Sequence, residues 1–191
     1  MKNIFLIHGY GGNGKENWFP WLKEKLEKNN YNVIVPVFPT PEGQSLESWK
    51  KIFEKYKKYV NEDTEYVGHS AGCLLIMKLM ENIKAKNIYL ASIFDRALHI
   101  EGYADIDEKN SSFYDNGIGY EKIRKNCKSI KTYLSKNDPY IPFEHQMEVS
   151  NSLNAKKTIF DNAGHFNEAA GCLEFEKLLN DILEMNNGKT N

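Results

Sequence analysis

The stretch that decides the fold is Glu65-Tyr66-Val67-Gly68-His69-Ser70-Ala71-Gly72-Cys73. It begins as a short apolar strand and continues from Cys73 to about Ile83 as an apolar helix. The G-x-S-x-G pattern between them predicts a nucleophile elbow, a tight turn that exposes a serine hydroxyl at the top of a sheet. Gly68 and Gly72 suit this turn, because larger side chains there would collide with the neighbouring strand and helix. The alternative is that Ser70 only caps the following helix.

Strand-like and helix-like stretches alternate along the rest of the chain. Strands are predicted over residues 4–7, 33–37, 65–67, 87–93, 130–134 and 157–160, and helices over 17–29, 45–60, 73–83, 143–153 and 168–185. Ser45 is the expected N-cap of the second helix, without the Glu or Gln that would complete a capping box. The alternation predicts a doubly wound α/β fold with a mostly parallel sheet and helices on both faces. Sites in such sheets lie at the carboxyl ends of the strands.

Residues 94–128 interrupt this alternation with a polar, poorly periodic run. We interpret them as a long excursion over the sheet edge or over the mouth of a site, since loops of this length are often functional. The chain shows neither internal repeats nor a linker. We therefore expect a single domain over residues 1–185, followed by a polar C-terminal tail over residues 186–191.

The composition of the 191 residues excludes several classes of protein. Apolar residues make up 41%, too many for a disordered chain, and 25 basic against 26 acidic residues argue against a nucleic-acid partner. Apolar runs fall short of the roughly 20 residues that span a bilayer, so we expect no membrane association. The three cysteines, Cys73, Cys127 and Cys172, form no C-x-x-C pair. This favours reduced thiols and a cytoplasmic location, with no disulfide framework, metal or cofactor.

A serine nucleophile needs a base, and a histidine base needs an acid that orients it. Of the five histidines, His165 follows the last predicted strand, and Asp138 follows the fifth strand within Asn137-Asp138-Pro139. The order Ser70, Asp138, His165 is the one that a G-x-S-x-G hydrolase uses. Asp95, after the fourth strand, is the alternative acid.

Two backbone N–H groups are expected to stabilise an oxyanion. The N–H of Ala71 lies at the start of the helix after Ser70, and that of Tyr10 lies in the glycine-rich loop after the first strand. The same loop also matches G-x-G-x-x-G, from Gly9 to Gly14, which is a dinucleotide-binding pattern. The second strand lacks the acidic residue that such a site needs for a ribose.

Aromatic residues that flank the strand ends are candidates for a substrate pocket. They are Phe94, Phe113, Tyr114, Tyr140, Phe143 and Phe166, of which we select Phe113, Tyr140 and Phe166. His, Asp and Glu residues do not cluster at metal-ligand spacing, so we expect no metal at the site.

With these residues in place, the chain resembles the small α/β-hydrolases, and more closely the compact serine hydrolases that include retinoblastoma-binding protein 9 and many bacterial relatives. The resemblance covers nearly the whole chain and rests on Ile7-His8-Gly9-Tyr10-Gly11-Gly12, Trp18, Pro36-Val37-Phe38-Pro39, Trp49, Gly68-His69-Ser70-Ala71-Gly72, Asn137-Asp138-Pro139-Tyr140-Ile141-Pro142 and Ala163-Gly164-His165-Phe166. It implies six parallel strands in the order 2-1-3-4-5-6, little or no lid, and a triad of Ser70, Asp138 and His165.

The resemblance also bears on activity and partners. It favours a carboxylesterase over a lipase, acting on a small acyl substrate through an acyl-enzyme intermediate. An amidase or aminopeptidase-like serine hydrolase is the enzymatic alternative, and a non-catalytic protein-binding module on the same fold is the rival from another class. The L-x-C-x-E motif for binding retinoblastoma protein is absent. The sequence leaves open the substrate, the oligomeric state and whether residues 94–128 partly cover the site.

Overall fold

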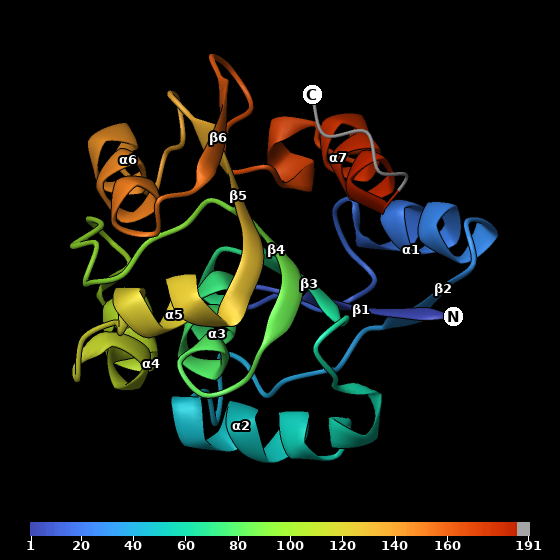
Figure 1. The fold of residues 1–191 in the computed structure, drawn as a ribbon. Coiled ribbons are helices and arrows are strands. Elements are labelled where there is room, and N and C mark those ends of the chain that lie inside the picture. The colour runs from blue at the N-terminus through green and yellow to red at the C-terminus, as the bar shows by residue number, and fades with distance from the viewer. Residues whose placement is uncertain (187–191) are drawn as a thin grey trace.

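The computed structural model describes residues 1–186. Its sheet has six parallel strands in the order β2-β1-β3-β4-β5-β6 (Figure 1). The strands are β1 (Lys2–Ile7), β2 (Tyr31–Ile34), β3 (Glu65–His69), β4 (Ala85–Ala91), β5 (Cys127–Ser135) and β6 (Lys156–Phe160). This confirms the order that the family resemblance implies. Because β1 and β3 are neighbours, the loops that follow them meet at one end of the sheet.

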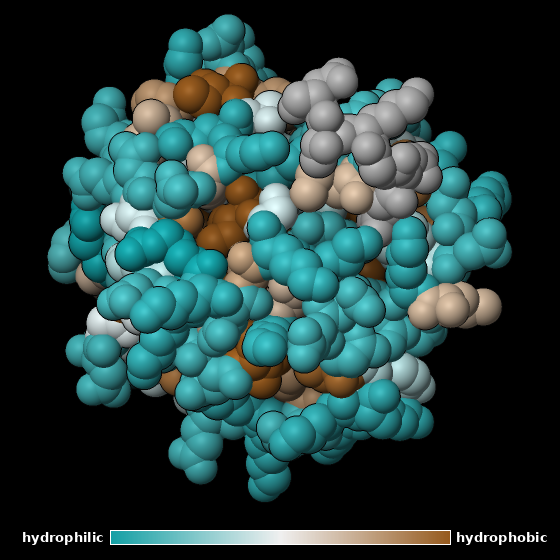
Figure 2. Space-filling model, viewed as in Figure 1, coloured by the Kyte–Doolittle hydropathy of each residue, from teal (hydrophilic) through white to brown (hydrophobic). Residues whose placement is uncertain are grey.

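Helices cover both faces of the sheet, as predicted. One face packs against α1 (Phe19–Lys28) and α7 (Glu176–Asn186), and the other against α2 (Leu46–Glu54), α3 (Ala71–Met80), α5 (Tyr120–Asn126) and α6 (Phe143–Ser152). α4 (Ala104–Tyr114) packs on α2 and α3. Every residue of α3 is buried, which explains why its sequence is apolar nearly all round. The outer surface seen in Figure 2 is mostly hydrophilic, with apolar residues in small separate groups.

Several element boundaries differ from the predicted ones, and three of the differences concern β2 and the second and last predicted helices. β2 ends at Ile34, before its predicted end, and Pro36 just beyond it has no N–H for the sheet ladder. The helix predicted over residues 45–60 is α2 followed by a separate 3-10 turn, Lys57–Tyr59. The helix predicted over residues 168–185 is a 3-10 turn and then α7, separated where Gly171 adopts a φ of 76°. Of the predicted tail, Asn186 ends α7 and residues 187–191 lie outside the described residues.

The N-terminus of α2 has a complete capping box after all. The Ser48 N–H donates to Ser45 Oγ, and the Ser45 N–H donates to Ser48 Oγ, both at 3.1 Å. The Ser48 hydroxyl therefore replaces the Glu or Gln side chain of the usual capping box.

The excursion over residues 94–128 contains two helices, α4 and α5, which the weak periodicity of this segment did not predict. Only Asn110 and Phe113 of α4 are buried. The helix therefore has no apolar stripe from which its helical period could be recognised in the sequence. Phe113 anchors α4 by packing edge-on against Trp49, with ring centroids 5.2 Å apart. Asp107 accepts the N–H groups of Leu98 and His99, both at 2.7 Å, and so ties the preceding loop to the same helix.

Candidate active site

Ser70 stands on a strained turn between β3 and α3. Its backbone has φ 53° and ψ −123°, a region that residues with side chains rarely adopt. The two glycines of the motif leave room for the turn. A Cβ on Gly72 would lie 2.2 Å from the Ile7 carbonyl oxygen, and one on Gly68 would lie 3.0 Å from the Cys73 nitrogen. The collisions anticipated from the sequence therefore involve β1 on one side and α3 on the other.

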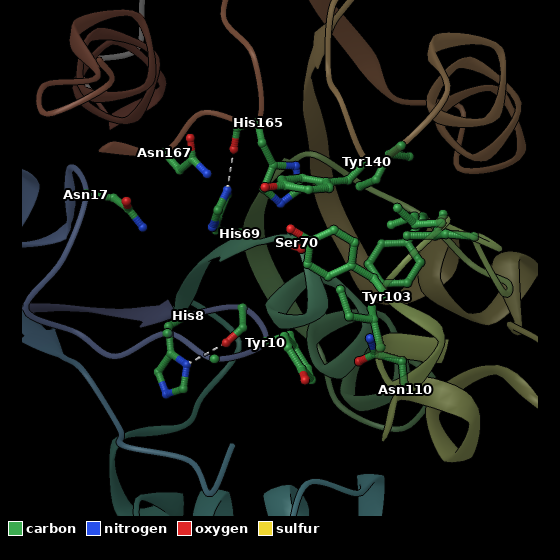
Figure 3. A pocket seen from close by; sticks show the side chains of 18 of the residues that line it. His8, Tyr10, Asn17, His69, Ser70, Tyr103, Asn110, Tyr140, His165 and Asn167 are labelled. Atoms are coloured by element: carbon green, nitrogen blue, oxygen red, sulfur yellow. Dashed lines mark hydrogen bonds between the residues drawn. The ribbon is translucent and has the colours of Figure 1, made fainter. Parts of the chain in front are cut away.

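A cavity of about 350 Å³ opens above Ser70 at the carboxyl ends of the strands. Its walls come from the loop after β1, the elbow, residues 94–110, and the loops after β5 and β6. Ser70 and His165 both belong to its lining (Figure 3). The volume lies at the lower end of the range of small-molecule sites, about 300–1,000 Å³.

His165 is paired with Asp138. The His165 Nδ1 lies 2.9 Å from Asp138 Oδ2 and 3.1 Å from Oδ1, so the Nδ1–H donates to the carboxylate. The Nε2 of the same ring is thereby left as the acceptor. In Figure 3 the His165 ring lies beside the turn that carries Ser70.

Asp138 is held as a carboxylate by several donors. The Ser92 hydroxyl donates to Oδ2 at 2.8 Å, and the N–H groups of Tyr140 and Ile141 donate to Oδ1 at 3.0 and 3.2 Å. Burial by itself would raise the pKa of Asp138, but the hydrogen bond and charge of His165, with the bonds from Tyr140 and Ser92, hold it below its ordinary value. Ser92, directly after β4, is a site residue that the sequence analysis missed, although its place next to a strand end was a signal.

The loop that carries His165 is fixed from two sides. His69 Nε2–H donates to the His165 carbonyl oxygen at 2.7 Å (Figure 3), and Trp18 Nε1–H donates to the Phe166 carbonyl oxygen at 2.9 Å. Burial first, and then the neighbouring His165, lower the pKa of His69 to about 3, so its ring is neutral. His69 therefore acts as a structural donor beside the elbow rather than as a base.

His8 fixes the loop after β1 in a similar way. Its Nε2 accepts the Phe38 N–H at 3.1 Å, and its Nδ1–H donates to the Gly9 carbonyl oxygen at 2.9 Å. Burial lowers the pKa of His8, in keeping with a neutral ring. A Cβ on Gly9 would lie 2.9 Å from the Ser70 Cβ, so this loop approaches the serine more closely than a larger residue would allow.

The N–H groups of Tyr10 and Ala71 lie on the two loops that meet at Ser70. Neighbouring N–H groups are used within the protein: Gly11 donates to Thr40 Oγ1 at 2.7 Å, and Ser70 donates to the Ala91 carbonyl oxygen at 2.9 Å. The N–H groups of Tyr10 and Ala71 have no acceptor within residues 1–186. The Tyr10 hydroxyl donates to Asp105 of α4, which ties this loop to the excursion.

Of the three predicted pocket residues, one lines the cavity and two do not. Tyr140 lines the cavity, and its ring meets the His165 ring edge-on with centroids 4.9 Å apart. Phe113 and Phe166 do not line it. Phe113 is a buried residue of α4 and belongs to the core, and Phe166 is buried against Phe175 on the other face of the sheet. The prediction was wrong for both, because position near a strand end does not fix the direction of a side chain.

The cavity has an apolar wall and a polar wall that the sequence analysis missed. Phe94, named there only as a wider candidate, joins the apolar wall with Leu98, Ile100, Tyr103, Ile106 and Ile141, whereas the polar wall consists of Asn13, Glu16, Asn17 and Asn167. The apolar residues alternate with charged ones along a segment without clear periodicity, so no pattern marked them.

Asp95, the alternative acid, belongs to another cluster. Its Oδ1 lies 2.8 Å from His145 Nε2, and its Oδ2 accepts the Tyr120 hydroxyl at 2.5 Å. Neither Asp95 nor His145 lines the cavity. Within residues 1–186 no three His, Cys, Asp or Glu side chains gather as metal ligands, and no helix there has the length and apolar character needed to cross a bilayer.

Two curated proteins are similar to this chain over most of its length. YdeN of Bacillus subtilis (strain 168) is 28% identical over 174 residues, 89% of this chain and 88% of YdeN, and the serine hydrolase RBBP9 of Rattus norvegicus is 27% identical over 183 residues, 94% of this chain and 93% of that protein.

Solved structures show the same fold. The crystal structure of the B. subtilis ydeN product has a TM-score of 0.88 at 26% identity, covering 98% of this chain and 100% of that one. The Pyrococcus furiosus esterase PF2001 shares the fold, with a TM-score of 0.69 at 16% identity over 96% of this chain and 80% of that one. The architecture is thus that of the α/β-hydrolases. The family model for serine hydrolases matches residues 4–183, and the chain belongs to that family.

Proposed function

We propose that the protein is a carboxylesterase-like serine hydrolase that cleaves a small ester through an acyl-enzyme intermediate. The observation that carries the proposal is the strained Ser70 opening into a cavity that it shares with His165, whose Nδ1 is held 2.9 Å from Asp138. A hydroxyl needs a neighbouring base before it can attack a carbonyl, and this arrangement provides one.

The reaction follows from the orientation of the His165 ring. Ser70 Oγ attacks the ester carbonyl carbon while His165 Nε2 takes its proton, and the same proton then passes to the departing alcohol oxygen. Water next attacks the acyl-enzyme, giving its proton to Nε2, and the acid is released as Ser70 recovers its proton. Asp138 keeps the ring in the required tautomer and stabilises the imidazolium.

The N–H groups of Tyr10 and Ala71 are proposed as the oxyanion hole. Both come from loops that meet at Ser70, and neither has another acceptor within residues 1–186. Such donors are aimed in advance at charge that develops only in the transition state, which makes them effective.

The cavity favours a small, neutral acyl group. Its volume of about 350 Å³ suits a short chain, and its apolar wall suits hydrocarbon. Glu16 contributes a carboxylate to the lining, whereas Lys and Arg are absent from the lining residues of the described chain. An acyl group with its own carboxylate would therefore lack a cationic partner.

The test is labelling of the purified protein with a fluorophosphonate, with Ser70→Ala as the control, followed by mapping of the modified peptide. We expect labelling on Ser70 only, and turnover of short-chain p-nitrophenyl esters that the variant lacks. A matched set of aminoacyl amides separates esterase from amidase activity. A well-folded wild type that takes no label and cleaves no ester would contradict the proposal and leave a binding module as the explanation.

A further inference from the structure

The polar wall of the cavity contains two asparagine amides whose N–H donors the protein does not use. Asn17 Oδ1 accepts the Glu168 N–H at 2.7 Å, and Asn167 Oδ1 accepts the Ala170 N–H at 3.0 Å. Because a backbone N–H can only donate, these bonds fix which end of each amide is the oxygen. Neither Nδ2 has an acceptor within residues 1–186, and both residues line the cavity and are partly exposed. A molecule in the cavity can therefore accept from both amides.

Glu16 adds a carboxylate to the same wall. Its Oε1 accepts from Asn13 Nδ2, and Asn13 Oδ1 in turn accepts the Lys15 N–H at 2.9 Å, so the side chain is held at one oxygen. Glu16 is partly exposed, and no Lys or Arg side chain of the described residues lines the cavity beside it. A carboxylate accepts several hydrogen bonds, so Glu16 keeps acceptor capacity that a molecule in the cavity can use.

Two amide donors and one carboxylate acceptor together match hydroxyl groups. A hydroxyl both donates and accepts, so a vicinal diol can donate to Glu16 while its oxygens accept from Asn17 and Asn167. An ammonium group would match Glu16 but would turn its own N–H groups toward the two amide donors. A phosphate or carboxylate group would meet the charge of Glu16 without a cation to offset it. The wall is therefore complementary to a neutral, hydroxyl-bearing group.

The polar wall adjoins the side of the site from which the alcohol departs. In the proposed reaction His165 Nε2 protonates the departing oxygen, which must then lie within hydrogen-bond reach of this ring. Asn167 is two residues beyond His165 on the same loop, and the Glu168 N–H ties Asn17 to that loop. In Figure 3 Asn17 and Asn167 lie on one side of Ser70, and Tyr103 of the apolar wall lies on the other. The apolar wall is thus left to the acyl chain.

We propose that Glu16, Asn17 and Asn167 form a subsite for a departing alcohol that carries a vicinal diol, as in an ester of glycerol or of a sugar. This inference rests on the proposed hydrolase function. An alkyl alcohol of the same shape would displace water from all three side chains and form no hydrogen bond in return. Sites built to hydrogen-bond a substrate hydroxyl discriminate against the analogue that lacks it.

The test uses three butyrate esters whose alcohols differ in hydrogen bonding. 2,3-Dihydroxypropyl butyrate donates and accepts, 2,3-dimethoxypropyl butyrate only accepts, and 2-methylbutyl butyrate does neither. For the wild type we expect kcat/KM, measured by titration of the released acid, to favour the diol over the alkyl ester by at least about fivefold. A second pair, methyl 6-O-butyrylglucoside against cyclohexylmethyl butyrate, distinguishes a sugar from glycerol as the source of the diol.

Variants separate the acceptor of the wall from its donors. Glu16→Gln keeps an oxygen for Asn13 but replaces the free acceptor by a donor, so the diol-to-dimethoxy ratio of kcat/KM should fall about fivefold. Asn17→Asp keeps an oxygen for the Glu168 N–H but replaces the donor by an acceptor, so the dimethoxy-to-alkyl ratio should fall by a similar factor. Glu168→Gln and Asn162→Asp make the same chemical changes in exposed side chains outside the lining and should leave both ratios unchanged.

Circular dichroism and fluorophosphonate labelling of Ser70 show whether each variant is folded and active. If Asn17→Asp does not fold, Asn167→Asp carries the test of the donors. This substitution keeps an acceptor for the Ala170 N–H, and Asp is as good an N-cap as Asn.

The outcomes separate the subsite from the hydrolase itself. A wild type without preference for either diol ester, or ratios that survive both Glu16→Gln and Asn17→Asp, would overturn the diol subsite and leave the hydrolase proposal standing. Preference for butyrylcholine over 3,3-dimethylbutyl butyrate, without one for a diol, would overturn it in favour of a cationic alcohol. Absence of both ester hydrolysis and Ser70 labelling would overturn the two proposals together.

Discussion

The molecule contains two buried histidine–aspartate pairs of nearly equal geometry. His165 Nδ1 lies 2.9 Å from Asp138, and His145 Nε2 lies 2.8 Å from Asp95. In each pair the acid follows a strand, β5 for Asp138 and β4 for Asp95. Yet only the first pair has its histidine in the cavity with Ser70.

A short histidine–carboxylate contact therefore does not by itself bring a histidine into the cavity beside Ser70. His165 turns Nδ1 to its acid and keeps Nε2 available beside the cavity, whereas His145 uses Nε2 for Asp95. Asp95 is also occupied by the Tyr120 hydroxyl and lies 3.7 Å from the Arg96 guanidinium. The second pair therefore joins α5 and α6 to the end of β4, and we assign it a structural role.

Removal of the two histidines should separate these roles most strongly. For His165→Ala we expect kcat/KM for a short ester to fall by at least about 10⁴-fold, since the serine loses its base. For His145→Ala we expect less than about a threefold loss of kcat/KM at 25 °C but a fall of about 1–3 kcal/mol in the free energy of unfolding. Ester kinetics and urea unfolding of both variants test these expectations. Equal losses of kcat/KM in the two variants would show that the two histidines do not differ in role.

Removal of the negative charge of each acid gives the next largest effect. Asp138→Asn should lower kcat by about 10³- to 10⁴-fold, because the amide can donate to Nδ1 and favour the wrong tautomer. Asp95→Asn should leave kcat within about threefold of the wild type. Steady-state kinetics at neutral pH provide the measurement; a larger loss for Asp95→Asn would make Asp95 the acid of the site.

The donors that support each acid provide a milder test. Ser92→Ala removes the 2.8 Å bond to Asp138, and Tyr120→Phe removes the 2.5 Å bond to Asp95. We expect Ser92→Ala to lower kcat/KM by about tenfold and to move the acidic limb of its pH profile, since one of the bonds that lower the Asp138 pKa is gone. Tyr120→Phe should leave that profile in place. Identical profiles for all three proteins would show that Ser92 does not act through Asp138.

His69, which supports only the first pair, should affect stability rather than catalysis, and its effect should depend on pH. Its folded pKa of about 3 lies below the ordinary value of 6.5, so the unfolded chain takes up a proton first as the pH falls. Stability is therefore lost from about pH 6.5 downward, by up to roughly 1.4 kcal/mol per pH unit for one such group.

The variant His69→Gln keeps a donor for the His165 carbonyl oxygen but cannot titrate. Between pH 4.5 and 6.5 its free energy of unfolding should fall less steeply than that of the wild type, with the remaining slope owed to groups such as His8. Urea unfolding across this range is the measurement. Parallel curves for the two proteins would mean that His69 is not the group that titrates.

Much of the fold could be predicted because its signals are local. The strand, elbow and helix around Ser70 follow from spacing alone, and the alternation of strands and helices gives the parallel sheet. α4 escaped prediction because its buried contacts, such as Phe113 on Trp49, come from tertiary packing rather than from a visible stripe. Gly171 split the last predicted helix through a backbone conformation that composition does not reveal.

The candidate site was predictable only where topology positions a residue. Strand ends brought Ser70, Asp138 and His165 to one edge of the sheet, whichever way the loops turned. Pocket walls depend on the direction of each side chain, and there Phe113 and Phe166 were misplaced. The hydrogen bonds that join Thr40 through Gln44 to Asn110 were likewise invisible in the sequence, because only the folded chain brings these residues together.

The bond from Trp18 to the Phe166 carbonyl oxygen has a consequence for how the protein is made. It joins residues 148 positions apart, and β6 and the His165 loop are synthesised after most of the sheet. During translation Ser70 and Asp138 leave the ribosome well before the base does. On the proposed mechanism, the nascent chain therefore carries Ser70 without its base, and hydrolytic activity arises only as the N-terminal and C-terminal ends of the fold pack together.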